Sequence, residues 1–317
     1  SMIVRFIGFL YRVPMTAIIG DSGNAIYSAG YQVYNFLLIL SSAGLPAAIG
    51  KMVSERLALK QYRNAHRVFK VSLAFSAAMG LFFMVLLMLF AQPIAVNICK
   101  IPGAYYTLLT LAPTIFIVGI MSVLRGYFQG MNNMVPTAFS QIVEQIFNAV
   151  FSVLLAYIFI KQSVALSAAG GTAGTGIGAL AGLLVMLFVY WLNSKSIKKR
   201  NRRPVRGYEI ESTSTILKIL LSTAIPIIIG TAIYSITNLV DMSMVMSRLL
   251  ESGAFTNKEA EVLYGQLQGK YVVLTTLPVA ISTSIATAAV PNIAASMALK
   301  DRSAVERKIN AAIKISM

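Results

Sequence analysis

The sequence contains 317 residues, of which 57% are hydrophobic and only 12% are charged, whereas about 25% of residues are charged in an average soluble domain. The formal net charge is +16, but the basic residues gather in short stretches between apolar runs. This composition excludes an ordinary water-soluble fold, and the placement of the charge argues against nucleic-acid binding as the function.

Apolar runs of membrane-spanning length recur along the whole chain. A helix needs about 20 apolar residues to cross roughly 30 Å of hydrocarbon, and most of the uncharged stretches reach that length alone. The two that flank Glu144 reach it only if this acid lies inside one helix. The sequence contains no alternation of the β-barrel type, so we predict an all-α polytopic membrane protein. The uncharged stretches are 22–50, 71–99, 101–124, 126–143, 145–160, 162–194, 219–240 and 271–299.

Turn residues divide these runs into individual helices. The sequence Gly20-Asp21-Ser22-Gly23 follows the first helix, Pro93 and Pro102 interrupt the connection after the third, and Gly130-Met131-Asn132-Asn133 follows the fourth. The basic stretch 51–70 is expected to be a loop after the second helix. In chain order we predict helices at 1–19, 27–50, 71–91, 104–124, 135–160, 171–193, 216–247 and 268–299, and a ninth that begins near Ser303.

The basic residues alternate between successive connections. Six Lys and Arg residues lie in 51–70, seven in 195–206 and five in 300–314, while the intervening connections contain few. According to the positive-inside rule, the basic connections are cytoplasmic. The first helix is therefore expected to run outward, and each later helix to reverse direction.

The most basic and polar connection predicts a domain boundary. We expect an N-terminal lobe with helices 1–6 at 1–193, a cytoplasmic linker at 194–215, and the start of a C-terminal lobe at 216–317. The first helix has no cytoplasmic anchor, and the last one stops after an amphipathic start. We therefore expect a fragment of a longer transporter, truncated at both ends.

A glycine-rich run at 170–178 resembles a phosphate-binding loop only superficially. Such a loop needs a preceding strand and a soluble βαβ unit, and the sequence predicts neither. Gly174, Gly178 and Gly182 instead recur every four residues, which predicts a stripe of small residues for close helix packing in the membrane.

The sequence contains no arrangement of residues that indicates catalysis. The single histidine, His66, lies in a basic stretch, and the single cysteine, Cys99, has no partner for a disulfide or a thiolate mechanism. We therefore expect neither an enzyme nor a cofactor, apart from a coupling Na⁺ or H⁺.

Charged residues inside a membrane are costly and indicate function. Arg5 and Arg12 are seven residues apart, so they share one face of the first helix. The planar guanidinium can donate two parallel hydrogen bonds to a phosphate, and the alternative is that both side chains reach the inner interface. Lys51 is a further candidate for substrate binding, the alternative being a surface ion pair with Glu55.

Two acids and one more arginine are candidates for coupling or gating. Glu144 lies in the middle of the fifth predicted helix, where it either relays protons or is satisfied by a neighbouring helix. Asp241 follows Thr237 and Asn238 by one turn, and these oxygens either hold a small cation such as sodium or form a structural hydrogen-bond cluster. Arg125, at the end of the fourth predicted helix, is the third candidate.

Several sequence segments resemble one family. They resemble the stage V sporulation protein B and polysaccharide-biosynthesis branch of the multidrug/oligosaccharidyl-lipid/polysaccharide (MOP) exporter superfamily, to which the lipid II flippases also belong. The resemblance covers essentially the whole chain. The segments are Gly8-Phe9-Leu10-Tyr11-Arg12, GLPAAIGKMVSE at 44–55, SVLRGYFQG at 122–130, NMVP at 133–136, SQIVEQ at 140–145, TLP at 276–278 and VP at 290–291.

The resemblance implies a transporter fold of roughly fourteen helices, with two six-helix lobes around a cationic cavity. This chain would supply the first six-helix lobe and the start of the second. The cavity arginines of the family correspond to Arg12 and Arg5, although these stand one residue further apart than in the Gram-negative lipid II flippases. Asp241 would correspond to an acid that the superfamily uses for a coupling cation.

Three functions follow as hypotheses. The first is a flippase that moves a polyprenyl-diphosphate-linked saccharide across the bacterial plasma membrane by alternating access, as a monomer surrounded by membrane lipids. The second is a cation-coupled multidrug exporter of the same superfamily, although arginines on the first helix would repel cationic drugs. The third is a non-transporting scaffold for cell-wall or spore assembly, against which the intramembrane charges argue.

Overall fold

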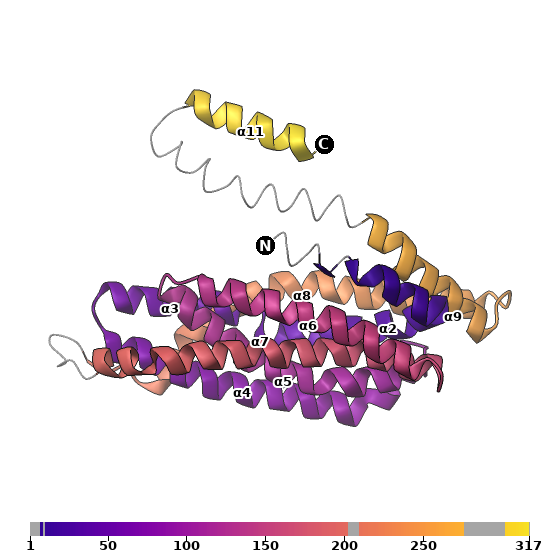
Figure 1. The fold of residues 1–317 in the computed structure, drawn as a ribbon, viewed down its shortest axis with the longest axis horizontal. Coiled ribbons are helices and arrows are strands. Elements are labelled where there is room, and N and C mark those ends of the chain that lie inside the picture. The colour runs from indigo at the N-terminus through magenta and orange to yellow at the C-terminus, as the bar shows by residue number, and fades with distance from the viewer. Residues whose placement is uncertain (1–6, 9, 202–208, 276–301, 317) are drawn as a thin grey trace.

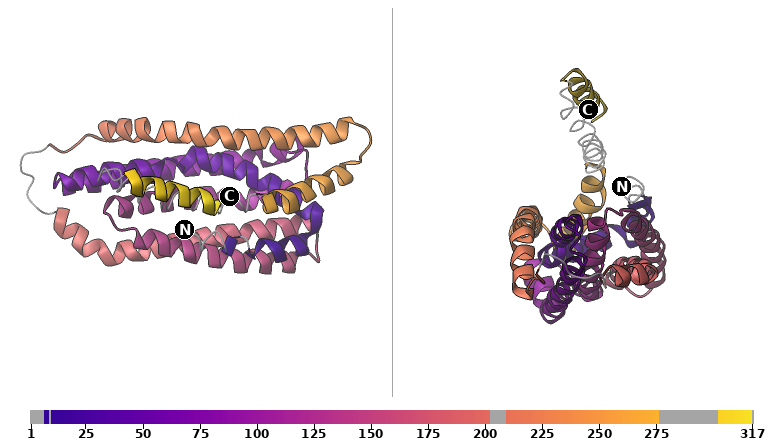
Figure 2. Two further views of the ribbon diagram at one scale, coloured as in Figure 1. Left: turned by 90° about the horizontal axis from the view of Figure 1, so that it is seen from above. Right: turned by 90° about the vertical axis from the view of Figure 1, so that its left-hand side faces the viewer.

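The computed structural model describes residues 7–8, 10–201, 209–275 and 302–316, and in this part of the chain every regular element is a helix. Figures 1 and 2 show the long helices side by side in an elongated bundle. The elements are α2 (Arg12–Ser42), α3 (Leu45–Ala58), α4 (Tyr62–Pro93), the π-helix η1 (Ile94–Ile98), α5 (Ala104–Gly130), α6 (Val135–Phe159), α7 (Val164–Asn201), α8 (Thr213–Glu251), α9 (Asn257–Gln266), the π-helix η2 (Leu267–Tyr271) and α11 (Arg302–Ser316).

The membrane helices that were predicted between residues 12 and 247 are present as long apolar helices. Of the helical segments that the structure describes, six are long and apolar enough to cross a membrane. Many of their large apolar side chains, such as Phe82, Leu89 and Phe188, are exposed on the surface of the bundle. In a membrane this surface contacts lipid, so the prediction of an all-α polytopic membrane protein is confirmed.

The predicted turn after the first helix is a break within α2. Gly20 has φ 67° and ψ −175°, a conformation that glycine adopts without steric cost. The Asn24 side chain donates a hydrogen bond to the Gly20 carbonyl oxygen at 2.8 Å and stabilises the break. The first predicted helix therefore ends where expected, but helix resumes at once, and no separate loop is formed.

The basic stretch 51–70 is helical, and its prediction as a loop is wrong. The second predicted helix ends at Ser42, and α3 begins at Leu45 with Pro46 in its first turn and continues to Ala58. Only residues 59–61 separate α3 from α4. The charge count misses this helix because Met52 and Val53 are buried on the opposite face and pack in the core.

Two glycines close the contact between α3 and α5. A side chain at Gly126 would meet the Cα and the carbonyl oxygen of Pro46, each at 2.9 Å, and one at Gly130 would meet the Gly50 carbonyl oxygen at 2.8 Å. These two glycines belong to α5 because the helix continues to Gly130, whereas we had expected it to end at Arg125. Part of the family-like segment at 122–130 thus serves helix packing.

The glycine stripe of α7 packs against α6, as predicted. A Cβ at Gly178 would lie 2.6 Å from the Glu144 carbonyl oxygen, and one at Gly174 would overlap the backbone of Ser152. The helix α7 extends from Val164 to Asn201, so it is longer at both ends than the predicted 171–193. The predicted linker is therefore partly helical.

The end of the linker is held against the first lobe. Arg56 donates two hydrogen bonds to the Glu211 carboxylate, from Nε to Oε1 at 2.9 Å and from Nη2 to Oε2 at 2.7 Å. Asn64 Nδ2 donates a hydrogen bond to the Glu209 carbonyl oxygen at 3.0 Å, and Asn64 Oδ1 accepts one from the Glu211 amide at 3.1 Å. Directly afterwards Ser212 caps α8, accepting from the Thr215 amide. The linker thereby positions the first helix of the second lobe.

The outer connection after α8 contains a helix that we did not predict. Thr256 and Glu259 form a capping box at the start of α9, with the Thr256 amide donating to Glu259 Oε2 at 2.8 Å. The pattern Thr-x-x-Glu was present in the sequence as a signal for this helix. Most of the predicted helix 268–299 lies outside the described residues, and α11 begins at Arg302, next to the expected Ser303.

Candidate functional site

A large cavity lies between α2, α8 and the α9–η2 segment, and its volume is about 1060 Å³. Its walls consist mainly of tyrosine, amide and hydroxyl side chains together with methionines, and two arginines and one aspartate also line it. Residues that line it from α2 are Arg12, Tyr27, Ser28, Tyr31, Gln32 and Asn35, and those from α8 include Tyr234, Asn238, Asp241, Met242, Val245 and Arg248. A pocket with a few convergent polar groups is the usual form of a ligand site.

Arg12 lines this cavity from the first limb of α2, where its side chain is half-buried. Tyr27 and Tyr31, from the second limb of α2, line the same cavity. The break at Gly20 allows the two limbs to meet, because it redirects the chain after the first limb. The structure thus places Arg12 where a cavity arginine was expected, and its role in binding stays a prediction.

Three tyrosines form a ladder along α2. The rings of Tyr27 and Tyr31 stack with centroids 5.5 Å apart and planes at 14°, and Tyr31 meets Tyr34 edge to face at 5.5 Å. Their spacing of four and three residues puts them on one helix face. We did not single them out from the sequence, although this spacing was a readable signal.

Across the cavity, Gln32 and Tyr264 join the first lobe to α9. Gln32 Nε2 donates to the Tyr264 hydroxyl at 2.9 Å, and Tyr264 is 1% exposed. The sequence analysis missed both residues, because their contact joins positions more than 200 residues apart.

Asp241 lines the cavity from α8 and has an exposed side chain. Of the predicted oxygen cluster, Asn238 also lines the cavity, but the Thr237 hydroxyl donates to the Ile233 carbonyl oxygen of its own helix at 3.0 Å. Among the described residues no group of three or more His, Cys, Asp and Glu side chains could hold a metal ion. A cation site at Asp241 therefore remains a prediction.

Arg125 and Glu144 lie away from the cavity and pair with each other. Arg125 Nη2 lies 2.7 Å from Glu144 Oε2, and Arg125 Nε donates to Ser140 Oγ at 3.1 Å. The side chains are 14% and 21% exposed. Glu144 is therefore satisfied by a neighbouring helix, one of the two alternatives considered above, and a role in coupling or gating is a prediction that the geometry leaves untested.

The two remaining candidates for substrate binding are Lys51, which is not among the described residues that line the cavity, and Arg5. Lys51 has an exposed side chain on α3, and its expected partner Glu55 lies 3.9 Å from Arg56 instead. Arg5 lies outside the described residues.

Several contacts join α2 to the α9–η2 segment, and both of these parts of the chain line the cavity. Asp21 pairs with Lys270 at 2.8 Å and accepts a hydrogen bond from Gln266 at 3.0 Å. A side chain at Gly265 would overlap the Asp21 carbonyl oxygen. In the same region, burial raises the pKa of the Glu261 carboxyl, which accepts a hydrogen bond from Ser22 at 3.4 Å.

Residues 1–297 match the model of the family described as polysaccharide biosynthesis protein. The chain belongs to this family. It is a multi-pass bacterial membrane protein, and its fold is that of solved transporters of the MOP superfamily. It contains the first six-helix lobe and the start of the second, as the resemblance had implied.

Curated relatives of the family come from Bacillus subtilis (strain 168). Stage V sporulation protein B is 31% identical over 317 residues, which are 100% of this chain and 60% of the relative. Lipid II flippase MurJ is 27% identical over 327 residues, which cover 98% of this chain and 58% of the relative. The chain thus spans about three fifths of the length of these relatives.

Solved structures show the same fold. An inward-facing multidrug resistance MATE family transporter of the MOP superfamily matches with a TM-score of 0.64 and 17% identity, over 97% of this chain and 70% of that one. A MOP superfamily transporter from Pyrococcus furiosus, whose title states a reversed polarity of the binding pocket, matches with a TM-score of 0.61 and 19% identity, over 99% of this chain and 66% of that one.

Proposed function

We propose that this chain is part of a flippase that moves a polyprenyl-diphosphate-linked saccharide across the cytoplasmic membrane. The observation that carries the proposal is the position of Arg12 in a cavity of about 1060 Å³ between the first lobe and the start of the second. No covalent bond is made or broken during this transport. The site therefore only has to bind the substrate on one side and release it on the other.

The lining of the cavity suits the two chemical parts of such a substrate. The Arg12 guanidinium can donate parallel hydrogen bonds to a diphosphate, and each charge-assisted bond contributes on the order of 1.5–3 kcal/mol. Tyrosine rings and amide groups, such as Tyr31 and Asn35, offer stacking surfaces and hydrogen bonds for a saccharide. The diphosphate would bind Arg12 while the saccharide lies along the tyrosine ladder.

Release on the outer side requires the outer end to open. At this end, the contacts of Asp21 with Lys270 and Gln266 join α2 to the α9–η2 segment. In alternating access one lobe rocks against the other, and these contacts between α2 and η2 would break when the cavity opens outward. The relative named lipid II flippase MurJ supports this proposal through its similarity over 98% of the chain.

A cation-coupled drug exporter is the second candidate, because Asp241 lines the same cavity and the fold resembles that of multidrug transporters. The charged residues of the lining favour the first candidate. Arg248 is paired with Glu251 at 3.2 Å, so Arg12 and Asp241 are the remaining charges of the described lining. Arg12 is the more buried of the two, and its positive charge attracts an anionic head group and repels a cationic drug.

The test is reconstitution of the protein, expressed from its complete reading frame, into phosphatidylcholine vesicles. A polyprenyl diphosphate disaccharide is added to the outer leaflet, and its loss of accessibility to a membrane-impermeant glycosidase is followed. We expect protein-dependent loss of accessibility. A protein that moves a cationic dye against its gradient but leaves the disaccharide in place would support the drug exporter instead.

A further inference from the structure

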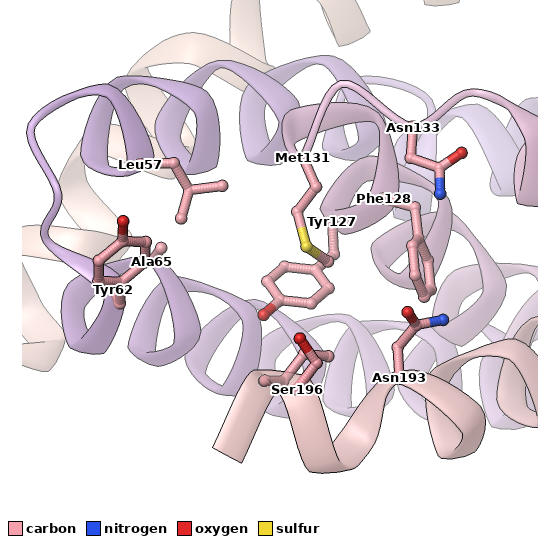
Figure 3. A pocket seen from close by; sticks show the side chains of 10 residues that line it. Leu57, Tyr62, Ala65, Tyr127, Phe128, Met131, Asn133, Asn193 and Ser196 are labelled. Carbon is pink, nitrogen blue, oxygen red and sulfur yellow. The ribbon is translucent and has the colours of Figure 1, made fainter. Parts of the chain in front are cut away.

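A second pocket lies at the opposite end of the first lobe from α9. Its volume is about 180 Å³, whereas a single water molecule needs only ~10–15 Å³ of such space. The turn between α3 and α4, the end of α5 with the following turn, and the last turns of α7 form its walls, as Figure 3 shows. The pocket lies beside the basic stretches that the positive-inside rule places in the cytoplasm.

Aromatic rings form a fixed wall of the pocket. Tyr127 and Phe128 are 4% and 2% exposed, and the Tyr127 ring packs against Phe69 with centroids 4.6 Å apart. The Tyr62 ring stands on the other side, at the start of α4 (Figure 3). Because the Tyr127 and Phe128 side chains are buried among neighbours, little conformational entropy is lost when a ligand binds to them.

Amide and hydroxyl groups of the exposed residues Asn133, Asn193 and Ser196 line the facing side, where they are open to solvent and to a ligand. Asn133 Oδ1 accepts from the Val135 amide at 3.2 Å, and Asn193 Nδ2 donates to the Val189 carbonyl oxygen at 2.8 Å. Within the described part of the chain, the Asn133 amide nitrogen, the Asn193 amide oxygen and the Ser196 hydroxyl have no protein partner. The pocket therefore offers a donor, an acceptor and a hydroxyl that can do both.

The described lining of the pocket is uncharged, and two basic residues that adjoin lining residues in the chain, Arg63 and Lys195, are here called its basic rim. No charged side chain is among the described residues that line the pocket. Arg63 follows the lining residue Tyr62, Lys195 precedes the lining residue Ser196, and both basic side chains are exposed. An uncharged ring with hydroxyl groups fits the lining, and an anionic group attached to this ring would lie near the basic rim.

We infer that this pocket binds a sugar ring whose phosphate faces the basic rim. It would hold the saccharide of the lipid-linked substrate on the cytoplasmic side before the head group enters the cavity that Arg12 lines. In this respect the inference rests on the proposed function. The flat aromatic faces pack against the apolar faces of the ring, while Asn133, Asn193 and Ser196 bond its hydroxyl groups.

The experiment measures binding of soluble probes by ligand-observed saturation-transfer NMR. The protein from the complete reading frame is placed in nanodiscs of phosphatidylcholine alone, and the probes are N-acetylglucosamine, N-acetylglucosamine 1-phosphate and inorganic phosphate. Both sugars should bind, the phosphorylated one more tightly, and inorganic phosphate should not displace the neutral sugar.

The decisive variants change one hydrogen-bonding atom at a time. Asn133→Asp keeps the oxygen that caps Val135 but removes the amide donor, so it should weaken binding of neutral N-acetylglucosamine about three- to tenfold, as expected for one lost hydrogen bond. Asn133→Ala combined with Asn193→Ala should weaken it further. The matched control is Asn97→Ala, because Asn97 is an exposed asparagine in η1.

The results of this experiment distinguish sugar binding in this pocket from substrate binding in the cavity that Arg12 lines. Arg12→Ala should leave binding of neutral N-acetylglucosamine unchanged, because this sugar has no phosphate for Arg12 to bind. If the unchanged protein binds the neutral sugar but does not flip the lipid-linked disaccharide, the proposed function is overturned and this inference is not. Equal binding by the Asn133 and Asn97 variants would overturn the inference. Displacement of the sugar by nanodiscs that contain phosphatidylglycerol would also overturn it, since the pocket would then be a site for lipid head groups.

Discussion

Arg125 on α5 and Glu144 on α6 form a largely buried ion pair, with 2.7 Å between Nη2 and Oε2. Ser140, one turn before Glu144, accepts a further hydrogen bond from Arg125 Nε at 3.1 Å. The positive charge of Arg125 and the negative charge of Glu144 are therefore paired within the helix bundle. The pair links two helices that are adjacent in the chain but joined only by a short turn.

Glu144→Ala should destabilise the protein, because it leaves the Arg125 charge without a carboxylate. Breaking a buried ion pair costs about 3–5 kcal/mol, and the cost here should be lower because both side chains keep some exposure. The measurement is the apparent Tm in detergent. The double variant Arg125→Met with Glu144→Leu should recover most of the loss, and Lys51→Ala, an exposed position, should have no effect.

The same pair distinguishes a structural acid from a proton relay. Glu144→Gln retains a hydrogen-bond acceptor for Arg125 but cannot take up a proton at pH 7. If Glu144 is structural, this variant should keep transport at a rate close to that of the unchanged protein. Loss of transport at an unchanged Tm would show that Glu144 relays protons.

Arg12→Ala should weaken binding of the diphosphate head group roughly ten- to a hundredfold, because it removes a charge-assisted contact of about 1.5–3 kcal/mol. Arg12→Lys keeps the charge but loses the planar fork, so its defect should be milder. The measurement is rescue of cells depleted of their lipid-linked precursor flippase, at matched expression. Full rescue by Arg12→Ala would remove the residue that carries the proposed function.

Asp241→Asn should reduce the dependence of transport on sodium or on a proton gradient, because it removes the only acid that lines the cavity in the described part of the chain. The side chain is exposed, so folding should be unaffected. Transport is measured in vesicles with imposed ion gradients. Unchanged ion dependence would show that Asp241 does not take part in coupling.

Gly265→Ala should force α9 away from α2, because the added methyl group overlaps the Asp21 carbonyl oxygen. Spin labels at Lys161 and Lys258, both exposed, should then show a longer or broader distance distribution. The control is Gly230→Ala in α8, where an added Cβ meets no atom within 4 Å. Identical distributions for the two variants would contradict the close packing at the outer end.

Cysteine labelling should test the orientation in the membrane. Cysteines at Ser196 and Ser163, both exposed, should be labelled only from inside and only from outside, respectively. The natural Cys99 need not be removed, because burial raises the pKa of its thiol to about 12, and the reactive thiolate is therefore scarce at neutral pH. The reverse labelling pattern would invert the topology.

Helix prediction from the sequence succeeded where hydropathy and turn residues agree. The fifth predicted helix, 135–160, matches α6 (Val135–Phe159) closely, because Pro136 and a polar turn mark its start and a long apolar run follows. The stretch 51–70 failed because charge density was read as a loop, although Met52 and Val53 show an amphipathic helix. The helix α9 was missed despite its capping box.

By itself, the sequence determined that this protein crosses the membrane as helices, that Gly20 ends the first of them, and that Gly174, Gly178 and Gly182 pack closely against a neighbour. These are local properties, since hydropathy, backbone freedom and helical spacing depend on residues within a few turns. The tertiary structure decided which charges meet. Arg56 pairs with Glu211 across 155 positions, and Arg12 shares its cavity with Asp241, because helix faces far apart in the chain must pack together before such partners are defined.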